Sequence, residues 1–285
     1  MRGWKAAEII LEELMLKSNS SVVVKVLFVL VGLSFGTGPL SAASWPVVGE
    51  IARKTLLSPY LYKLTVSVKT PGLFSYHPGQ WAFVALKDRQ ARAFTMSGAP
   101  EGFLNNGEAE FFITRKGALK GPAYQPGSSL SEDIWLANDG EDIFMSGPMG
   151  YELHPKEQRP MVFISKGSGV GPHLSVLASA MARSEDMNAT LVYLEHPDTI
   201  ADNLHDQLKD LSDHIPGFRW KSYTRNQFHG AWEEVVREII TLPELADQPD
   251  DAEYFICGSG GLRHHMAREL QRKGVNLSQI HKGDF

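Results

Sequence analysis

Residues 161–172 read MVFISKGSGVGP, and this stretch decides the fold. The apolar run MVFIS has the length and composition of a short buried strand, and a glycine-rich turn follows it at once. The turn ends at Pro172, which suits the first position of a helix because its missing N–H would have no partner there. A helical run from His173 to Arg183 comes next. The stretch therefore predicts a strand, a tight turn and a helix in succession.

The turn GSGVGP, residues 167–172, also has the features of a phosphate-binding loop. Glycine lets the backbone approach a pyrophosphate closely, and the exposed amides and the helix dipole attract negative charge. The candidate nucleotide-binding residues are Gly167, Gly169, Gly171 and Pro172. A tight turn without a ligand would have the same sequence, so the rest of the chain must decide between the two.

Strand and helix patterns alternate through the remainder of the chain. The strand patterns ATLVYLE, FRWKSY and EYFIC each precede a helical pattern, in order NLHDQLKDLS, AWEEVVREII and GLRHHMARELQRKG. Such alternation predicts a doubly wound parallel sheet whose ligands bind at the carboxyl ends of the strands. We expect this nucleotide-binding domain to span residues 158–285.

Residues 45–153 have a different pattern, with a period of two. In LYKLTVSVK, Leu64, Val66 and Val68 fall on one face and polar residues on the other, which is typical of a half-buried antiparallel strand. Turns rich in glycine, proline and asparagine separate the other expected strands. These strands are Trp81–Leu86, Arg92–Ser97, Glu108–Thr114 and Asp142–Ser146. Many short strands with almost no helical pattern predict a small closed β-barrel.

Residues 1–44 precede both patterns and contain an amphipathic stretch followed by an apolar one. No charged residue occurs from Val26 to Gly49, and about 20 apolar residues suffice to span a bilayer. We therefore expect a membrane anchor, with the catalytic domains in the cytoplasm. Two alternatives stay open. One is a cleaved signal peptide, whose basic start is disturbed here by three glutamates. The other is a buried or poorly ordered extension.

The composition excludes several classes of function. Hydrophobic residues make up 43% and charged residues 21%, as in globular proteins, and the net charge of −5 argues against a broad nucleic-acid-binding surface. Cys257 is the single cysteine, so neither an intrachain disulfide nor a cluster held by about four cysteines is available. His264 and His265 are adjacent on a predicted helix and point in different directions, so no metal site is predicted.

The stretch RAFTMS, residues 92–97, places an arginine, an aromatic residue and two hydroxyls in a predicted barrel strand. A plain strand needs none of them, but a strand that holds a flavin phosphate and a flavin ring could use them all. With GSGVGP and with FICGSGGLRHHM at 255–266, in this order, the chain resembles the ferredoxin–NADP reductase superfamily, in particular its ferric-reductase and NADPH-oxidase-like branch. This resemblance covers residues 45–285 and implies an antiparallel flavin-binding barrel followed by a parallel-sheet nucleotide-binding domain.

The resemblance implies a flavin site on the barrel. Arg92 is expected to bind the flavin phosphate as a fixed fork of donors, and Phe94 to pack on the flavin, where many relatives have tyrosine. Thr95 would lie near the flavin N5, and Ser97 completes the motif. The second turn that helps to bind the pyrophosphate in relatives falls near Gly117, where no hydroxyl lies in the turn. FAD rather than FMN is therefore implied by the branch and not by this segment.

The resemblance also implies a site for NADPH or NADH. Cys257 and Gly258 would lie at the nicotinamide, with an ordinary buried cysteine as the alternative. Thr224 and Arg225 follow a predicted strand, where relatives place hydroxyl and basic residues on the 2′-phosphate, and a basic residue favours NADPH. Phe285 would cover the flavin face that the nicotinamide must reach, with a frayed chain end as the alternative.

The leading hypothesis is an enzyme that passes electrons from NAD(P)H through FAD to an acceptor. Its candidate catalytic residues are Thr95, Cys257 and Phe285. The acceptor could be a ferric chelate, a quinone or a partner electron carrier, because the chain lacks cysteines for a cluster and has no histidine before the barrel. The alternative is a membrane-tethered flavin- or nucleotide-binding sensor without turnover, which Phe94 and the missing hydroxyl near Gly117 favour.

Overall fold

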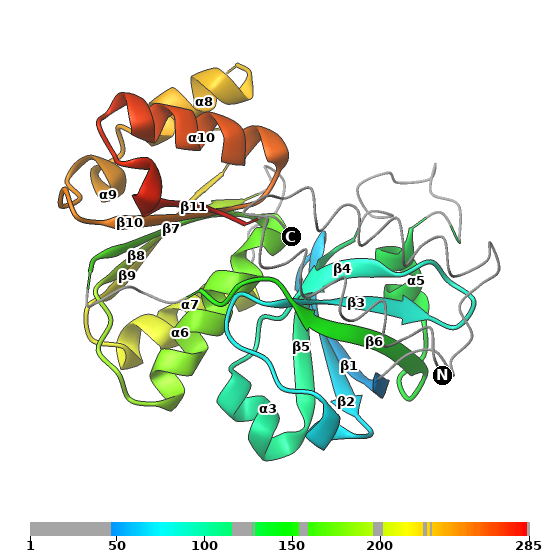
Figure 1. Ribbon diagram of the computed structural model, residues 1–285. Coiled ribbons are helices and arrows are strands. Elements are labelled where there is room, and N and C mark those ends of the chain that lie inside the picture. Colours follow the sequence, from blue (N-terminus) through cyan, green and yellow to red (C-terminus); the bar gives the residue numbers. More distant parts are fainter. Residues whose placement is uncertain are drawn as a thin grey trace, which may run out of the picture. The chain divides into compact units, whose positions relative to one another are not determined.

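A computed structural model describes residues 47–115, 127, 129–153, 159–195, 202–224, 227–228 and 230–283 (Figure 1). The expected anchor at residues 1–44 lies outside the described residues, as do Gly117, Arg225 and Phe285. All the described residues belong to one compact unit, Ala42–Phe285. Within the described part, no helix has the length and apolar character needed to cross a bilayer.

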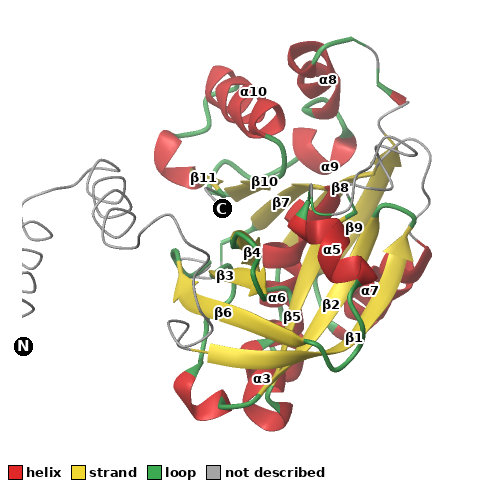
Figure 2. Cartoon of the chain, turned by 90° about the vertical axis from the view of Figure 1, so that its right-hand side faces the viewer, coloured by secondary structure: helices red, strands yellow, loops and turns green. Residues whose placement is uncertain are grey.

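The first sheet is antiparallel and closes on itself. Its strands are β1 (Val47–Ser58), β2 (Leu61–Val68), β3 (Trp81–Leu86), β4 (Arg92–Thr95), β5 (Glu108–Thr114) and β6 (Asp142–Met149), in the order β4-β3-β6-β1-β2-β5. Just after β4, Met96 pairs with Phe111 of β5, and the Ser97 amide donates to the Glu110 carbonyl at 2.8 Å. These contacts join the two edge strands (Figure 2), so the predicted barrel is confirmed.

The alternating pattern of β2 places its apolar side chains in the barrel core. Leu64, Val66 and Val68 are all buried there, as predicted. Strand β1 and two short helices, α3 (Pro100–Asn106) and α5 (Leu130–Leu136), were not predicted. Each helix has seven residues, too few for a 3.6-residue period to show. Only its ends mark α3, with Pro100 at the start and Gly107 at φ +71° after its last turn.

The second sheet is parallel and carries helices on both faces. Its strands are β7 (Met161–Lys166), β8 (Ala189–Glu195), β9 (Phe218–Thr224), β10 (Glu253–Cys257) and β11 (Ile280–Lys282), in the order β11-β10-β7-β8-β9. Its helices are α6 (Gly171–Ala182), α7 (Asp202–His214), α8 (Trp232–Ile239), α9 (Pro243–Ala246) and α10 (Gly260–Arg272). Helices α6 and α7 lie on one face, and α8 and α10 on the other (Figure 1). The predicted doubly wound sheet is therefore confirmed, with α9 and β11 as additions.

Burial along β7 shows why the strand is apolar throughout. Phe163 packs into the cluster that contains α6 and α7, whereas Val162 and Ile164 pack into the cluster that contains α8 and α10. Successive side chains point to opposite faces of a strand, and both faces are covered here. An uninterrupted apolar run, rather than an alternating one, is the expected sequence of such a strand.

The two sheets share one apolar cluster. Leu57, Leu61 and Phe112 of the barrel are buried in the same cluster as Leu174 and Leu177 of α6. Beside it, Asn203 Nδ2 of α7 donates to the Leu56 carbonyl at 2.7 Å. Apolar packing therefore holds the barrel and the parallel-sheet domain together, rather than the connecting chain alone.

A buried histidine lies in the first turn of α6. His173 is 1% exposed, stacks on Phe163 at 4.7 Å between ring centroids, and has its Nδ1 atom 2.5 Å from Ser165 Oγ. Burial lowers the pKa of His173 to about 3. The folded protein therefore keeps this ring neutral at pH values where an unfolded histidine, with a pKa of about 6.5, is protonated.

We expect His173 to make the fold acid-sensitive. Below about pH 6.5 the unfolded chain binds a proton at His173 that the folded protein does not. The free energy of unfolding is therefore unaffected by His173 above about pH 6.5 and falls by roughly 1.4 kcal/mol per pH unit from there toward pH 3. In His173→Gln, the free energy of unfolding measured in urea should vary less between pH 6.5 and 4 than in the parent. His214→Gln, which changes an exposed side chain, is the control. An unchanged pH slope in His173→Gln would contradict the expectation.

Candidate active site

Three segments that are distant in sequence meet at one edge of the parallel sheet. They are the turn after β7, which forms the 3-10 helix η4 (Gly167–Val170), the end of β10 at Cys257 and Gly258, and the segment Thr95–Ser97 of the barrel. Strands β7 and β10 are parallel neighbours, with Ser165 opposite Cys257. The chain leaves β7 toward β8 on one side and returns to β10 on the other, so this is the topological switch point where such sheets bind ligands.

Gly169 packs backbone to backbone against the end of β10. A β-carbon built on Gly169 would lie 2.7 Å from the Cys257 carbonyl oxygen and 2.8 Å from the Gly258 nitrogen, closer than any real β-carbon approaches. The two motifs are therefore in contact, and only glycine fits between them. Gly167, two residues earlier, has φ +55°, a conformation that glycine adopts without strain.

The same turn reaches the barrel. A β-carbon built on Gly171 would lie 3.5 Å from Ser97 Cβ and 3.9 Å from the Thr95 carbonyl oxygen. Thr114 Oγ1, at the end of β5, donates to Ser168 Oγ at 3.1 Å. The structure therefore brings the glycine turn, the Cys257–Gly258 segment and the end of the RAFTMS motif together.

The residues of RAFTMS differ in exposure. Arg92 pairs with Val84 of β3 through the strand ladder, and its exposed side chain makes no hydrogen bond or ion pair with any described residue. Phe94 is partly buried against the barrel core, and Thr95 pairs with Trp81 of β3. Ser97 is 2% exposed, yet its hydroxyl has no hydrogen-bond partner within the described chain. A buried hydroxyl without a partner is costly, so Ser97 is available to a bound group.

The thiol of Cys257 is protonated at neutral pH. Burial raises its pKa to about 12, against smaller opposite effects of Arg263 and of the Gly258 amide. The side chain therefore cannot act as a thiolate or as a base near neutral pH. What Cys257 can contribute to the site is its size and its position beside the glycine turn.

Lys166 and Trp232 form a part of the site that the sequence analysis missed. The Lys166 ammonium lies 4.5 Å from the centre of the Trp232 ring, a cation–π contact. Lys166 directly precedes the glycine turn and also borders Gly258, since a β-carbon on Gly258 would lie 3.1 Å from Lys166 Cβ. Its place between the strand and the turn is a signal that could have identified it. Trp232 begins a helix much later in the chain, and nothing local connects it to this edge.

A second glycine- and hydroxyl-containing turn leads into α5. Gly127 has φ +88°, and Ser129 Oγ lies 2.9 Å from Ser131 Oγ in a buried position. Arg89 donates to the Gly127 carbonyl at 2.6 Å and pairs with Asp133. This turn has the hydroxyls that the segment near Gly117 lacks, so it is the better candidate for the second flavin turn. The prediction placed the second turn near Gly117, ten residues earlier in the same glycine-rich segment.

Thr224 lies apart from this convergence. It ends β9, which is the edge strand two places from β7, and its amide donates to Gln227 Oε1 at 2.8 Å. Its neighbour Arg225 lies outside the described residues.

No protein-family model matches the chain. One subunit of the Na(+)-translocating NADH-quinone reductase of Pasteurella multocida is 24% identical over 223 residues, which cover 72% of this chain and 51% of that protein. The ferredoxin–NAD(P)(+) reductase component of the naphthalene 1,2-dioxygenase system of Pseudomonas putida is 30% identical over 133 residues, which cover 46% of this chain and 36% of that protein. The chain thus spans about half the length, or less, of these relatives.

Among solved structures, a ferredoxin NADP+ reductase from Neisseria gonorrhoeae with bound FAD and NADP matches with a TM-score of 0.65. The match covers 82% of this chain and 96% of that chain, at 19% identity. At this identity the likeness establishes the fold. It confirms the predicted sequence of an antiparallel barrel followed by a parallel-sheet domain.

We expect Gly169→Ala to disturb the turn, because the new methyl group would meet backbone atoms that cannot rotate away. Overpacking of this kind costs about 1–3 kcal/mol of the free energy of unfolding, which urea unfolding measures. Gly102→Ala is the matched control, since Gly102 lies in α3 with no atom within 4 Å of the added carbon. Equal stability of the two variants would show that Gly169 is not tightly packed.

Proposed function

Because the chain has the two-domain fold of the ferredoxin–NADP reductase superfamily, we propose that it is a flavoprotein oxidoreductase. It passes electrons from NAD(P)H through FAD to an acceptor outside the chain. The observation that carries this proposal is the proximity of Gly171 to Ser97 and Thr95, to which a β-carbon built on Gly171 would lie at 3.5 and 3.9 Å, since it brings the nucleotide turn to the flavin motif. The predicted superfamily resemblance is confirmed, and the ferric-reductase branch stays a prediction.

The residues around β4 fit a bound flavin. Arg92 offers an exposed guanidinium fork with no partner in the described chain, which suits a phosphate. Ser97 offers a buried hydroxyl that lacks a partner. Phe94, between them, is partly exposed and can pack on a ring. When bound, FAD supplies the capacity to accept a hydride and to release electrons one at a time.

The edge of the parallel sheet fits the nicotinamide nucleotide. The glycine turn presents backbone amides at the start of α6, where the helix dipole attracts a pyrophosphate, and Lys166 adds a positive charge beside it. Cys257 and Gly258 border the same turn and are proposed to position the nicotinamide ring. Thr95 lies where the two sites meet. The protein's contribution is to orient the two rings and to exclude water between them.

The finer assignments rest on the resemblance. NADPH is proposed over NADH from Thr224 and Arg225, and Phe285 is proposed to cover the flavin. The relatives' names include a quinone reductase subunit and a ferredoxin reductase component. A quinone or a partner electron carrier is therefore the proposed acceptor, with a ferric chelate as the alternative. Attachment to a membrane through residues 1–44 is also a proposal, as is the cytoplasmic location of the catalytic domains.

The proposal is tested by the colour of the purified protein and its response to reduced nucleotide. The protein should be yellow, or become yellow when FAD is added, and the visible flavin absorbance should bleach when NADPH or NADH is added without oxygen. A colourless protein that takes up no FAD, or a yellow one that neither nucleotide bleaches, would refute the reductase and favour the sensor. Steady-state rates with quinone, ferric and protein acceptors then identify the acceptor.

We expect Arg92→Ala to weaken flavin binding. A hydrogen bond to a charged group contributes about 1.5–3 kcal/mol, which corresponds to roughly a ten- to hundredfold loss of affinity. The dissociation constant is measured by titrating FAD into the stripped protein. Lys87→Ala is the matched control, because it removes another exposed positive charge, from the turn between β3 and β4. Arg92 would not be the phosphate ligand if both variants bound FAD as the parent does.

A further inference from the structure

One line of residues on α6 faces the barrel from the first turn of the helix to its end. These residues recur at every fourth position: Gly171, Ser175 and Ser179 of α6 and Arg183, which caps its C-terminal end. Residues four apart lie on the same side of an α-helix. Their partners are Ser97 and Gly98, in the short connection between β4 and α3, and Glu101, in the first turn of α3. We call these seven residues the seam.

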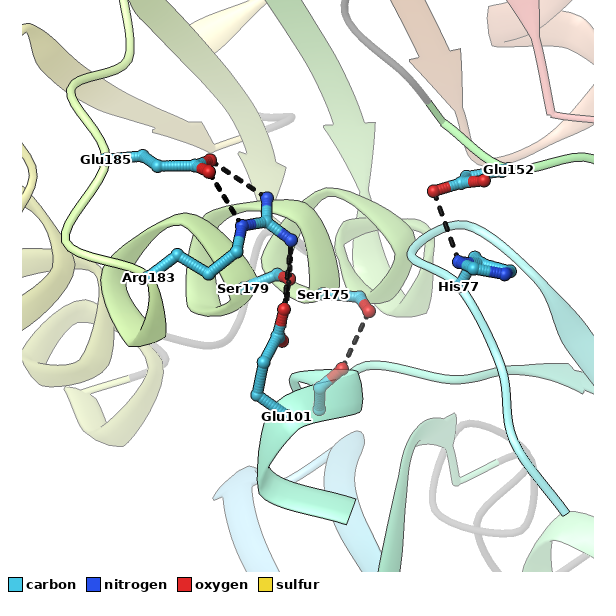
Figure 3. A network of polar contacts seen from close by, with 8 residues as sticks. His77, Glu101, Glu152, Ser175, Ser179, Arg183 and Glu185 are labelled. Carbon is cyan, nitrogen blue, oxygen red and sulfur yellow. Dashed lines mark hydrogen bonds and ion pairs between the residues drawn. The ribbon is translucent and has the colours of Figure 1, made fainter. Parts of the chain in front are cut away.

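The seam is bonded along its whole length. Ser175 Oγ donates to the Gly98 carbonyl at 2.7 Å, and Ser179 Oγ donates to Glu101 Oε2 at 2.7 Å. Arg183 Nη1 donates to Glu101 Oε1 at 2.9 Å. Figure 3 shows Ser175, Ser179 and Arg183 along one side of the helix, with Glu101 opposite the last two. At the start of α6, Gly171 lies so close to the barrel that a β-carbon built on it would lie 3.5 Å from Ser97 Cβ.

Because these contacts are buried, their donors and acceptors must stay within hydrogen-bonding distance. Ser175 and Ser179 are both 0% exposed, so their hydroxyls have no water to replace a lost acceptor. Partial burial alone would raise the pKa of Glu101, but the hydrogen bond from Ser179 and the charge of Arg183 outweigh it and lower that pKa. Glu101 is therefore an anion at neutral pH. Arg183 is held in turn by Glu185, which accepts from Nε at 2.9 Å and from Nη2 at 3.0 Å.

We propose that the seam sets the distance between the two rings of the reaction, and that Glu101 and Arg183 are positioning residues for hydride transfer. This inference rests on the proposed function. One side of the seam continues the strand that carries the flavin motif, and the other continues the turn that carries the nucleotide. A shift of α6 along the seam therefore moves one ring against the other. Neither residue touches the reacting atoms, so the effect is transmitted through α6.

The experiment compares Glu101→Ala, Arg183→Ala and the double variant with the parent and with Glu101→Gln. The control is Glu108→Ala, which breaks a Glu–Arg pair of similar geometry within the barrel, where Arg53 donates to Glu108 at 3.0 and 3.1 Å. The rate constant of anaerobic flavin reduction by NAD(P)H is measured by stopped flow. The dissociation constants of FAD and of the nucleotide are measured by titration. Hydrogen exchange reports the amides of residues 97–106 and of α6.

Flavin reduction should slow about ten- to a hundredfold in both single alanine variants. The double variant should be no slower than Glu101→Ala alone, because that substitution already removes the contact with Arg183 together with the acceptor of Ser179. Glu101→Gln keeps an oxygen acceptor for Ser179 and should be intermediate. If Glu101 and Arg183 act only by positioning the two rings, the dissociation constants of FAD and nucleotide should change less than about twofold. Amide exchange should rise on both sides of the seam, and Glu108→Ala should reduce at the parent rate.

Reduction of the alanine variants at the parent rate would overturn the proposal, and so would an equal slowing in Glu108→Ala. A loss of nucleotide affinity that accounts for the whole effect would also overturn it. Failure of the parent itself to be reduced by NAD(P)H would refute the proposed function instead. Hydrogen exchange would then still test the seam, since faster exchange confined to residues 97–106 would show that Glu101 does not hold α6.

Discussion

The close approach of helix α6 to the end of strand β4 is the contact on which the rest of the structure depends. Gly171 lies against Ser97 and Thr95 there, and Gly169 lies against the Cys257–Gly258 backbone. A side chain at Gly169 would force the turn away from β10, and a β-carbon on Gly171 would already be in van der Waals contact with Ser97. Leu57, Leu61 and Phe112 reinforce the approach, because these barrel residues are buried in the cluster that also contains α6. A site that needs groups from both sheets can therefore be held at fixed geometry without a ligand.

Buried polar groups collect where the two sheets meet, and they differ in how they are satisfied. Ser175 and Ser179 donate to barrel acceptors, and His173 is kept neutral beside Ser165. Ser97 alone of these has a buried hydroxyl with no partner in the described chain. An unsatisfied buried hydroxyl destabilises the protein, and this one lies within the RAFTMS stretch that is proposed to bind the flavin. In the segment from Ser97 to Glu101, stability thus requires acceptors for Ser175 and Ser179, whereas binding would use the hydroxyl of Ser97 that has no partner.

Much of the candidate site could be predicted because its residues lie in short, continuous motifs. The glycines of residues 167–171 can be interpreted from their backbone freedom alone, and the RAFTMS stretch can be interpreted from its residue types alone. Lys166 could have been added from its place before the turn. Trp232 and the line of contacts from Ser175 to Arg183 could not, because what makes them matter is a partner far away in the sequence. The turn at Gly127 was missed for a related reason, since an irregular connection carries no period from which its position can be counted.

Local sequence specifies the two kinds of sheet and their order. Alternating apolar residues, as in Leu64, Val66 and Val68, specify a strand with one covered face, and the apolar run before Gly167 specifies a strand covered on both. Residue type and spacing act within a few positions, so they can be read without knowledge of the fold. Tertiary packing alone determines which motifs touch, that the barrel closes through Met96 and Phe111, and that α6 faces the segment from Ser97 to Glu101. Those pairings depend on contacts between residues far apart in the chain, and no local preference encodes them.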